Sequence, residues 1–195
     1  MPLSLAIEWS TRRLSVATRI DDQFPVESSL RIERFQACDA LNLLEDHLSR
    51  QGLSPADLTH LIIGRGPGNF SGIRLAFAWS AGCLAPGGLQ LSAHSSGRVL
   101  AERLRRAIPS FCLLGDARRG YWWGCVADPS QIGDWELLTP ETWRRRIGSQ
   151  RVYSSEVSRL AGLEAVTESF PTALDLLQTE QPAEFTEPLY LHPAV

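Results

Sequence analysis

Lysine is absent from the 195-residue sequence, and all of its 19 basic residues are arginines. Without lysine the chain has no lysine nucleophile, no Schiff-base lysine and no P-loop lysine. The 22 acidic residues give a formal net charge of -3. A protein that grips nucleic-acid backbones by itself is usually basic, so this balance disfavours direct, tight binding of nucleic acid.

Cysteine and histidine are scarce, and neither type is spaced as in a metal site. The four histidines are unpaired in the sequence, and the four cysteines form no C-x-x-C motif. Their wide spacing fits neither a zinc ribbon nor a disulfide framework, which favours free thiols in a reducing compartment. We therefore expect no metal site and a cytoplasmic protein. The cysteines are Cys38, Cys83, Cys112 and Cys125.

Long apolar runs are missing too. No stretch approaches the roughly 20 apolar residues that cross a bilayer. The first apolar stretch has no basic segment before it and is interrupted by Glu8, so it predicts a strand and not a signal peptide.

The periodicity of apolar residues predicts an α/β protein. Three strands with short connections open the chain and imply an antiparallel meander. Helices and strands then alternate, and a change of pattern near Pro109 suggests two lobes, 1–108 and 109–195. The expected strands of the first lobe are 3–8, 14–20, 26–33, 60–63 and 89–92, and its helices are 35–51, 71–85 and 97–107.

A glycine-rich segment, GRGPGNFSGIR, joins the strand at 60–63 to the following helix. Glycine permits backbone angles closed to other residues, and a helix start offers unpaired N–H groups to an anion. A tight strand-to-helix turn explains the segment equally well, because it matches neither G-x-G-x-x-G nor a P-loop. The candidate anion-site residues are Gly64, Gly66, Pro67, Gly68, Asn69, Ser71, Gly72 and Arg74.

The same segment resembles the G-x-G-P-G-S-F-T-G-x-R signature of the TsaB (YeaZ) family, with Asn69 and Ser71 as small polar replacements. Asp116 to Gly120, DARRG, resembles the D-A-R-x-G turn of that family, and Glu187 to Leu191, EPLYL, resembles its E-P-x-Y-L motif. The resemblance thus spans almost the whole chain. It implies the actin/Hsp70/sugar-kinase fold, with two ribonuclease-H-like lobes, of which the second is shortened.

The resemblance also implies a function and partners. TsaB proteins support the formation of threonylcarbamoyladenosine in tRNA by pairing with a TsaD-type catalytic subunit and a TsaE-type ATPase. The TsaD subunit carries the metal and the chemistry. We therefore expect a non-catalytic scaffold and activator that contacts tRNA only indirectly and forms a homodimer when alone.

Several residues depart from the patterns of active relatives. Where kinases of this fold use Asp for Mg²⁺ and phosphate, the first strand ends Glu8-Trp9-Ser10-Thr11, and Mg²⁺ tolerates little change in geometry. Gln36 and Ala40 stand where the catalytic sister subunit has its metal-binding histidines. We expect no catalytic residue and no cofactor, with weak nucleotide binding in the assembled complex as the alternative. Glu8, Ser10, Thr11 and Asp116 occupy the degenerate phosphate and metal positions.

Two helices carry more apolar or small residues than one sheet face requires, which predicts an exposed patch for a partner. Two rival functions remain open: a small ATPase or kinase of the same fold, and a diverged homodimeric binding protein without the complex. The predicted partner interface comprises Leu41, Leu44, His47, Leu48, Phe77, Trp79, Ala81 and Gly82.

Overall fold

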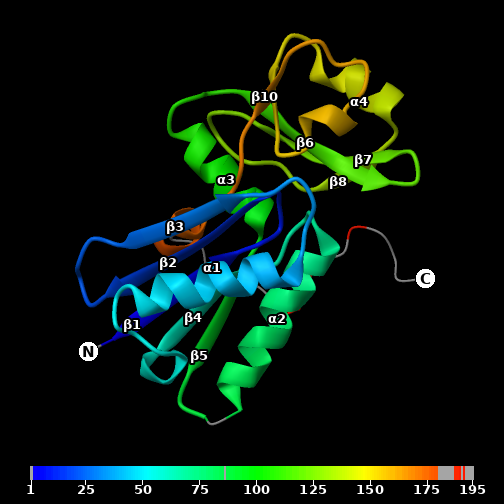
Figure 1. The fold of residues 1–195 in the computed structure, drawn as a ribbon. Coiled ribbons are helices and arrows are strands. Elements are labelled where there is room, and N and C mark those ends of the chain that lie inside the picture. Colours follow the sequence, from blue (N-terminus) through cyan, green and yellow to red (C-terminus); the bar gives the residue numbers. More distant parts are fainter. Residues whose placement is uncertain (1, 86, 180–186, 190, 192–195) are drawn as a thin grey trace. The chain divides into compact units, whose positions relative to one another are not determined.

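The computed structural model describes residues 2–85, 87–179, 187–189 and 191. The chain divides into two compact units (Figure 1). Unit 1 comprises residues 1–99 and 171–189, and unit 2 comprises residues 100–170 and 190–195.

Unit 1 is built on a mixed sheet of order β3-β2-β1-β4-β5. The first three strands form the antiparallel meander that the sequence predicts, and β4 and β5 run parallel to β1. The connections between parallel strands are helical, as such connections usually are. The strands are β1 (Leu3–Glu8), β2 (Arg13–Ile20), β3 (Val26–Arg31), β4 (His60–Gly64) and β5 (Gln90–His94).

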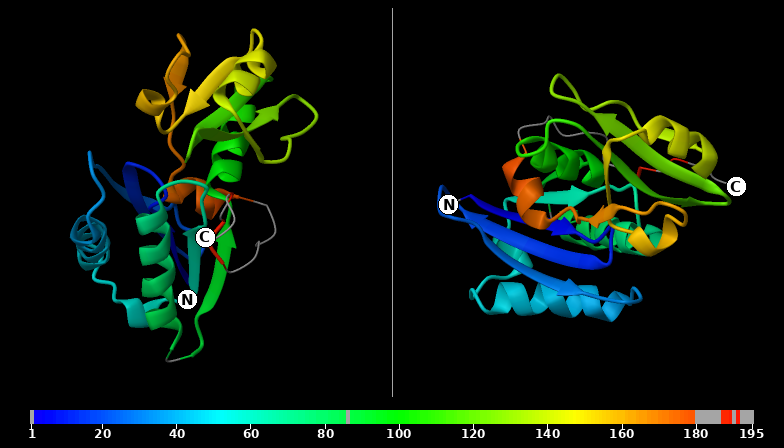
Figure 2. Two further views of the ribbon diagram at one scale, coloured as in Figure 1. Left: turned by 90° about the vertical axis from the view of Figure 1, so that its right-hand side faces the viewer. Right: turned by 90° about the horizontal axis from the view of Figure 1, so that it is seen from above.

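Helices cover both faces of this sheet. On one face lie α1 (Ala37–Ser49) and α2 (Phe70–Leu84), which pack on the inward-pointing leucines and isoleucines of β1 and β4. A 3₁₀ turn (Pro55–Asp57), which begins with a capping box formed by Ser54 and Asp57, precedes β4. On the opposite face lies α5 (Ala173–Gln178), as the view from above shows (Figure 2). This helix buries Leu176 and Leu177 against the small residues Ala6 and Ala17.

Unit 2 repeats the topology of unit 1 with shorter helices. Its sheet has the order β10-β9-β6-β7-β8, with the same antiparallel and parallel pairings in the same places. Helix α4 (Pro140–Ile147), capped by Thr139, stands where α1 stands in unit 1, and a 3₁₀ turn (Val157–Arg159) replaces α2. The strands are β6 (Phe111–Arg118), β7 (Tyr121–Ala127), β8 (Glu136–Leu138), β9 (Arg151–Ser154) and β10 (Val166–Glu168).

The division of the chain differs from the boundary expected near Pro109. The first unit ends at Val99, inside helix α3 (Ser96–Arg105). Residues 171–189, which the sequence places in the second lobe, belong to unit 1. Helix α5 accounts for this return, because its apolar residues join the core beneath β1, β2 and β4.

Candidate functional site

The glycine-rich corner begins where β4 ends, at Gly64, beside the carboxyl group of Glu8. Gly64 and Glu8 project to the same side of the sheet. A Cβ atom at residue 64 would lie 2.0 Å from Glu8 Oε2 and 2.6 Å from Ser96 Oγ. Glycine is therefore required at residue 64 by the side chain of Glu8, and not by a ligand.

The first turn of α2 is closed by backbone from the end of the first strand. The N–H of Asn69 donates to the carbonyl of Ser10 over 2.5 Å. Cβ atoms at Gly68 and Gly72 would lie 2.1 Å and 2.0 Å from the carbonyl oxygens of Ser10 and Trp9. These two glycines allow the strand to approach the helix, and the Ser10 carbonyl engages the Asn69 N–H, a group that could otherwise bind an anion.

The middle of the corner is held by the start of α3. Gly66, at a φ of +95° and followed by a cis bond to Pro67, accepts the N–H of Ser96 and the hydroxyl of Ser95. Its own N–H donates to Ser96 Oγ over 3.1 Å. On the other side, the N–H of Leu189 donates to the carbonyl of Arg65 over 2.8 Å. The corner is thus occupied by two other segments of unit 1.

Glu8 is fully buried. Its Oε1 accepts the N–H of Ser10 over 2.7 Å. Oε2 and the Ser96 hydroxyl both face the α-carbon of Gly64. Among the described residues, Oε2 has no hydrogen-bond partner. Burial raises the pKa of Glu8, and the Ser10 and Ser96 hydroxyls and the Ser10 N–H oppose that rise. Burial therefore favours the neutral form of this carboxyl group, whereas a carboxylate that holds Mg²⁺ is ionised.

The three residues after Glu8 are buried and take part in the packing and hydrogen bonding of unit 1. Trp9 points to the opposite side of the sheet and is fully buried in the core beneath α1 and α2. Thr11 forms hydrogen bonds of 3.2 Å with the backbone of Arg13. Ser10 Oγ is buried near the Glu8 carboxyl group, in a geometry that falls short of a hydrogen bond. Ser10 and Trp9 contact the glycine corner through their backbone carbonyls, at Gly68 and Gly72.

The remaining residues of the corner divide between its inside and the surface. Pro67 is buried, while Asn69 precedes α2 without a side-chain cap. Ser71 and Arg74 are exposed on α2. The guanidinium of Arg74 lies 5.2 Å from the ring centre of Phe70, which is itself exposed.

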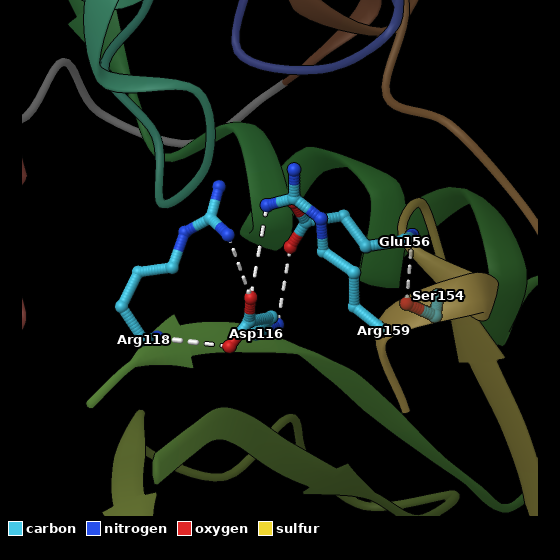
Figure 3. Close-up of polar contacts among 5 residues, drawn as sticks. All are labelled: Asp116, Arg118, Ser154, Glu156 and Arg159. Carbon is cyan, nitrogen blue, oxygen red and sulfur yellow. Dashed lines mark hydrogen bonds and ion pairs between the residues drawn. The ribbon is translucent and has the colours of Figure 1, made fainter. Parts of the chain in front are cut away.

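Asp116 lies in unit 2, at the carboxyl end of β6, in a network of charged side chains (Figure 3). Its Oδ2 lies 3.2 Å from an Arg118 nitrogen and 3.6 Å from an Arg159 nitrogen. Its N–H donates to Glu156 Oε2 over 3.1 Å. Glu156 in turn lies 3.3 Å from Arg159, and its N–H donates to Ser154 Oγ.

This network fixes the shape of the hairpin between β6 and β7. Arg118 and Arg119 have φ angles of +69° and +53°, a region that costs most residues energy. The N–H of Arg118 donates to Asp116 Oδ1 over 2.9 Å and so helps to hold this conformation. Burial raises the pKa of Glu156, which the positive charge of Arg159 opposes.

The predicted partner interface needs correction on α1. Leu44, His47 and Leu48 are buried beneath the helix. His47 Nδ1 lies 2.8 Å from Ser28 Oγ, and its Nε2 lies 3.1 Å from Thr18 Oγ1. These side chains hold α1 on β2 and β3 and are not available to a partner.

The exposed residues of the predicted partner interface lie on α2 and on one edge of α1. Leu41 is 37% exposed, and Ala81 and Gly82 are exposed on α2. Phe77 and Trp79 are half-buried and pack against the core of unit 1. We define the helix face as the exposed residues Leu41, Ser71, Arg74, Ala78, Ala81 and Gly82.

No cluster of three His, Cys, Asp or Glu side chains with the geometry of a metal site occurs among the described residues. None of the described helices has the length and apolar character needed to span a membrane.

Three contacts of these sites were not predicted from the sequence. They are the return of α5 to unit 1, the hydrogen bond between Leu189 and Arg65, and the participation of Glu156 and Arg159 in the Asp116 network. Only the first had a local signal. Thr172 and Asp175 form a capping box, a pattern that marks a helix start but not the sheet on which the helix packs.

Comparison with solved structures identifies the fold. YeaZ from Pseudomonas aeruginosa has a TM-score of 0.71 at 24% identity, covering 98% of this chain and all of that one. The ethanolamine utilization protein EutJ from Carboxydothermus hydrogenoformans has a TM-score of 0.52 at 13% identity, covering 90% and 89%. The chain is a two-lobed α/β protein of the actin-like ATPase fold, as the sequence predicts.

Within that class the chain is similar to TsaB proteins, which confirms the resemblance indicated by its motifs. The tRNA threonylcarbamoyladenosine biosynthesis protein TsaB of Bacillus subtilis (strain 168) is 27% identical over 122 residues, 60% of this chain and 51% of the relative. The protein of the same name from Escherichia coli (strain K12) is 29% identical over 151 residues, 73% and 65%. The chain therefore spans about half to two thirds of the length of these curated relatives. No protein-family model matches it.

Proposed function

We propose that the chain is a non-catalytic scaffold and activator in tRNA threonylcarbamoyladenosine biosynthesis, the process for which both curated relatives are named. In this proposal it pairs with a TsaD-type catalytic subunit. The observation that carries the non-catalytic role is the closure of the glycine corner by the chain's own backbone, above all the bond from Asn69 N–H to the Ser10 carbonyl.

Nucleotide turnover at this corner would require a different arrangement. A phosphate needs free N–H groups at the helix start, and Mg²⁺ needs ionised oxygen ligands that water and phosphate can reach. Here Ser10 and Trp9 carbonyl oxygens pack against the first turn of α2, and Glu8 is buried with a raised pKa. This supports a corner that sets the position of α2 and has no cofactor of its own.

The helix face is the proposed binding surface for the TsaD-type subunit, and for a second copy when that subunit is missing. Its small residues Ala78, Ala81 and Gly82 are exposed in a row along α2, where they would let a partner helix approach closely. The TsaE-type ATPase would join the assembled complex. In this proposal the protein acts in the cytoplasm.

Contact with tRNA would be indirect in this proposal. The net charge is -3, and the arginines of α4 already have partners within unit 2. Arg145 pairs with Glu141, Arg146 pairs with Glu136, and Arg144 donates to the Ala161 carbonyl.

Binding to the TsaD-type and TsaE-type homologues of the same organism tests the proposal, followed by a tRNA modification assay with and without the chain. Ala81→Arg places a long charged side chain on the helix face and should weaken binding to the TsaD-type subunit about tenfold or more, which corresponds to about 1.4 kcal/mol or more. Gln131→Arg adds the same charge on an exposed loop of unit 2 and should bind like the wild type.

The enzyme alternative makes the opposite prediction. A small ATPase or kinase would bind Mg-ATP tightly and hydrolyse it as the isolated chain, and Glu8→Ala would abolish that activity. Such a result would refute the scaffold role. Absence of any interaction with both homologues, together with modification that does not depend on the chain, would favour the diverged binding protein.

A further inference from the structure

One edge of the unit 1 sheet is formed by β3, which pairs with β2 and with no other strand among the described residues. No proline lies within β3 and its register with β2 has no bulge, although both features often protect an exposed edge. Apolar side chains gather along it instead. Phe24 is 97% exposed in the turn before β3, and Val26 and Leu30 are 50% and 40% exposed within the strand.

The hydrogen bonds of β3 define which of its backbone groups face outward. Ile32 donates its N–H to the Arg12 carbonyl, on the β2 side. Because backbone groups alternate between the two edges of a strand, Val26, Ser28 and Leu30 also direct theirs toward β2. The N–H and carbonyl groups of Glu27, Ser29 and Arg31 therefore point away from the sheet, toward the open edge.

We infer that β3 pairs antiparallel with β3 of a second copy of this chain, around a two-fold axis at Ser29, so that two sheets become one. In this register Ser29 lies opposite Ser29 of the second copy, and Glu27 lies opposite its Arg31. All the outward backbone groups then form ladder hydrogen bonds with one another. This interface is separate from the helix face and does not depend on the proposed function.

The charges on β3 select this register. Glu27 Oε1 accepts the N–H of Leu174 over 3.1 Å within the same copy. The negative charge of Glu27 would still attract Arg31 of the second copy across the interface, and it would do so twice because of the two-fold symmetry. Shifting the second strand by two residues in one direction places Pro25, which has no N–H, opposite Arg31. The same shift in the other direction places Glu27 opposite Glu33, where like charges repel.

The apolar residues fit the same arrangement. Ser28 contacts His47 of α1, so Val26 and Leu30 lie on the α1 face of the strand. Val26 would lie opposite Ile32 of the second copy. Because α1 packs on both β2 and β3, the α1 helices of the two copies would lie about 10 Å apart, a distance at which helices pack.

Dimer formation through β3 can be measured in the Ala81→Arg variant, because the added arginine disfavours association through the helix face. Sedimentation velocity at low and high protein concentration should show a concentration-dependent dimer. Adding Ser29→Pro, which removes an outward N–H and spares the β2 ladder, should leave a monomer at both concentrations. Ser29→Ala retains the N–H and should still dimerise.

Charge reversal supplies a second test in the same background, should Ser29→Pro disturb folding. Arg31→Glu should abolish the dimer, and Glu27→Arg with Arg31→Glu should restore it. Amide hydrogen exchange should slow at Glu27, Ser29 and Arg31 as the concentration rises, while Ser28 and Leu30 are protected throughout. A monomer at all concentrations, or a dimer that neither Ser29→Pro nor Arg31→Glu weakens, overturns the inference.

Discussion

The α-carbon of Gly64 lies against the buried carboxyl group of Glu8, with room for nothing larger than a hydrogen atom on the side of Glu8 Oε2. This contact joins the end of β4 to the end of β1 inside unit 1. It also explains a glycine of the conspicuous GRGPGNFSGIR segment by internal packing.

Gly64→Ala should therefore destabilise the protein. The added methyl group would overlap Glu8 Oε2 and Ser96 Oγ, and overpacking of this kind typically costs about 1–3 kcal/mol. Gly82→Ala is the matched control, because no atom lies within 4 Å of its new Cβ and alanine favours helix by about 1 kcal/mol. Chemical denaturation should show loss of stability for the first variant and a small gain for the second.

Glu8→Gln should remove a pH dependence of the free energy of unfolding. Burial raises the pKa of Glu8 in the folded protein above its ordinary value of 4.5. As the pH rises from 4.5, the unfolded chain loses this proton while the folded protein keeps it. The wild type therefore loses up to about 1.4 kcal/mol per pH unit until the raised pKa is passed.

Below pH 4.5 the wild type and Glu8→Gln should differ least, and above it the variant should become progressively the more stable. Unfolding free energies measured between pH 4 and pH 8 give the difference. Parallel curves for the two proteins would mean that Glu8 is ionised in the folded state.

His47→Ala should cost about 2–4 kcal/mol, since it leaves a cavity under α1 and removes the polar partner of Ser28 and Thr18. Asn42→Ala, exposed on the same helix, should stay within about 0.5 kcal/mol of the wild type. A similar small effect at both positions would contradict the buried placement of His47.

The stability lost in His47→Ala should also depend on pH, in the opposite direction to the effect of Glu8. Burial lowers the pKa of His47 below its ordinary value of 6.5. Its stabilising contribution is therefore complete above pH 6.5 and is lost as the pH falls toward the lowered pKa, because the unfolded chain takes up the proton first. The gap in stability between the wild type and His47→Ala should narrow below pH 6.5.

In unit 2, Arg159 should matter more than Arg118. The Arg159 side chain is 30% exposed and contacts both Asp116 and Glu156, whereas that of Arg118 is 64% exposed and contacts Asp116 alone. We expect Arg159→Gln to cost about 1–3 kcal/mol and Arg118→Gln less than about 1 kcal/mol. Double-mutant cycles with Asp116→Asn measure the two couplings; equal values would contradict this ranking.

Much of unit 1 could be predicted because its elements have strong local patterns. The alternation in β2 and β3 and the apolar stripe of α1 define a strand or a helix without knowledge of the rest of the chain. The return of α5 could not be predicted in this way. Its partners on the sheet are Ala6 and Ala17, and small residues on a strand give little indication of which face a helix will cover.

For the functional residues, too, local sequence patterns did not predict contacts between distant parts of the chain. The stripe on α1 indicates an apolar surface but not which part of it faces the sheet. That choice depends on Thr18 and Ser28, which meet His47 from neighbouring strands, and such contacts between distant residues have no signal along the sequence. Asp116 was singled out through its D-A-R-x-G motif, whereas its partner Arg159 belongs to no motif and lies in a separate turn.

Unit 1 is assembled from two stretches separated by about seventy residues of unit 2, and this has a consequence for biosynthesis. When residue 99 leaves the ribosome, the face of the sheet that carries Ala6, Ala17 and Ile62 still lacks α5. At about 5–20 residues per second, the helix that covers it arrives roughly 4–14 seconds later. The nascent chain thus exposes an uncovered apolar sheet for that interval, during which it is a natural client for a chaperone.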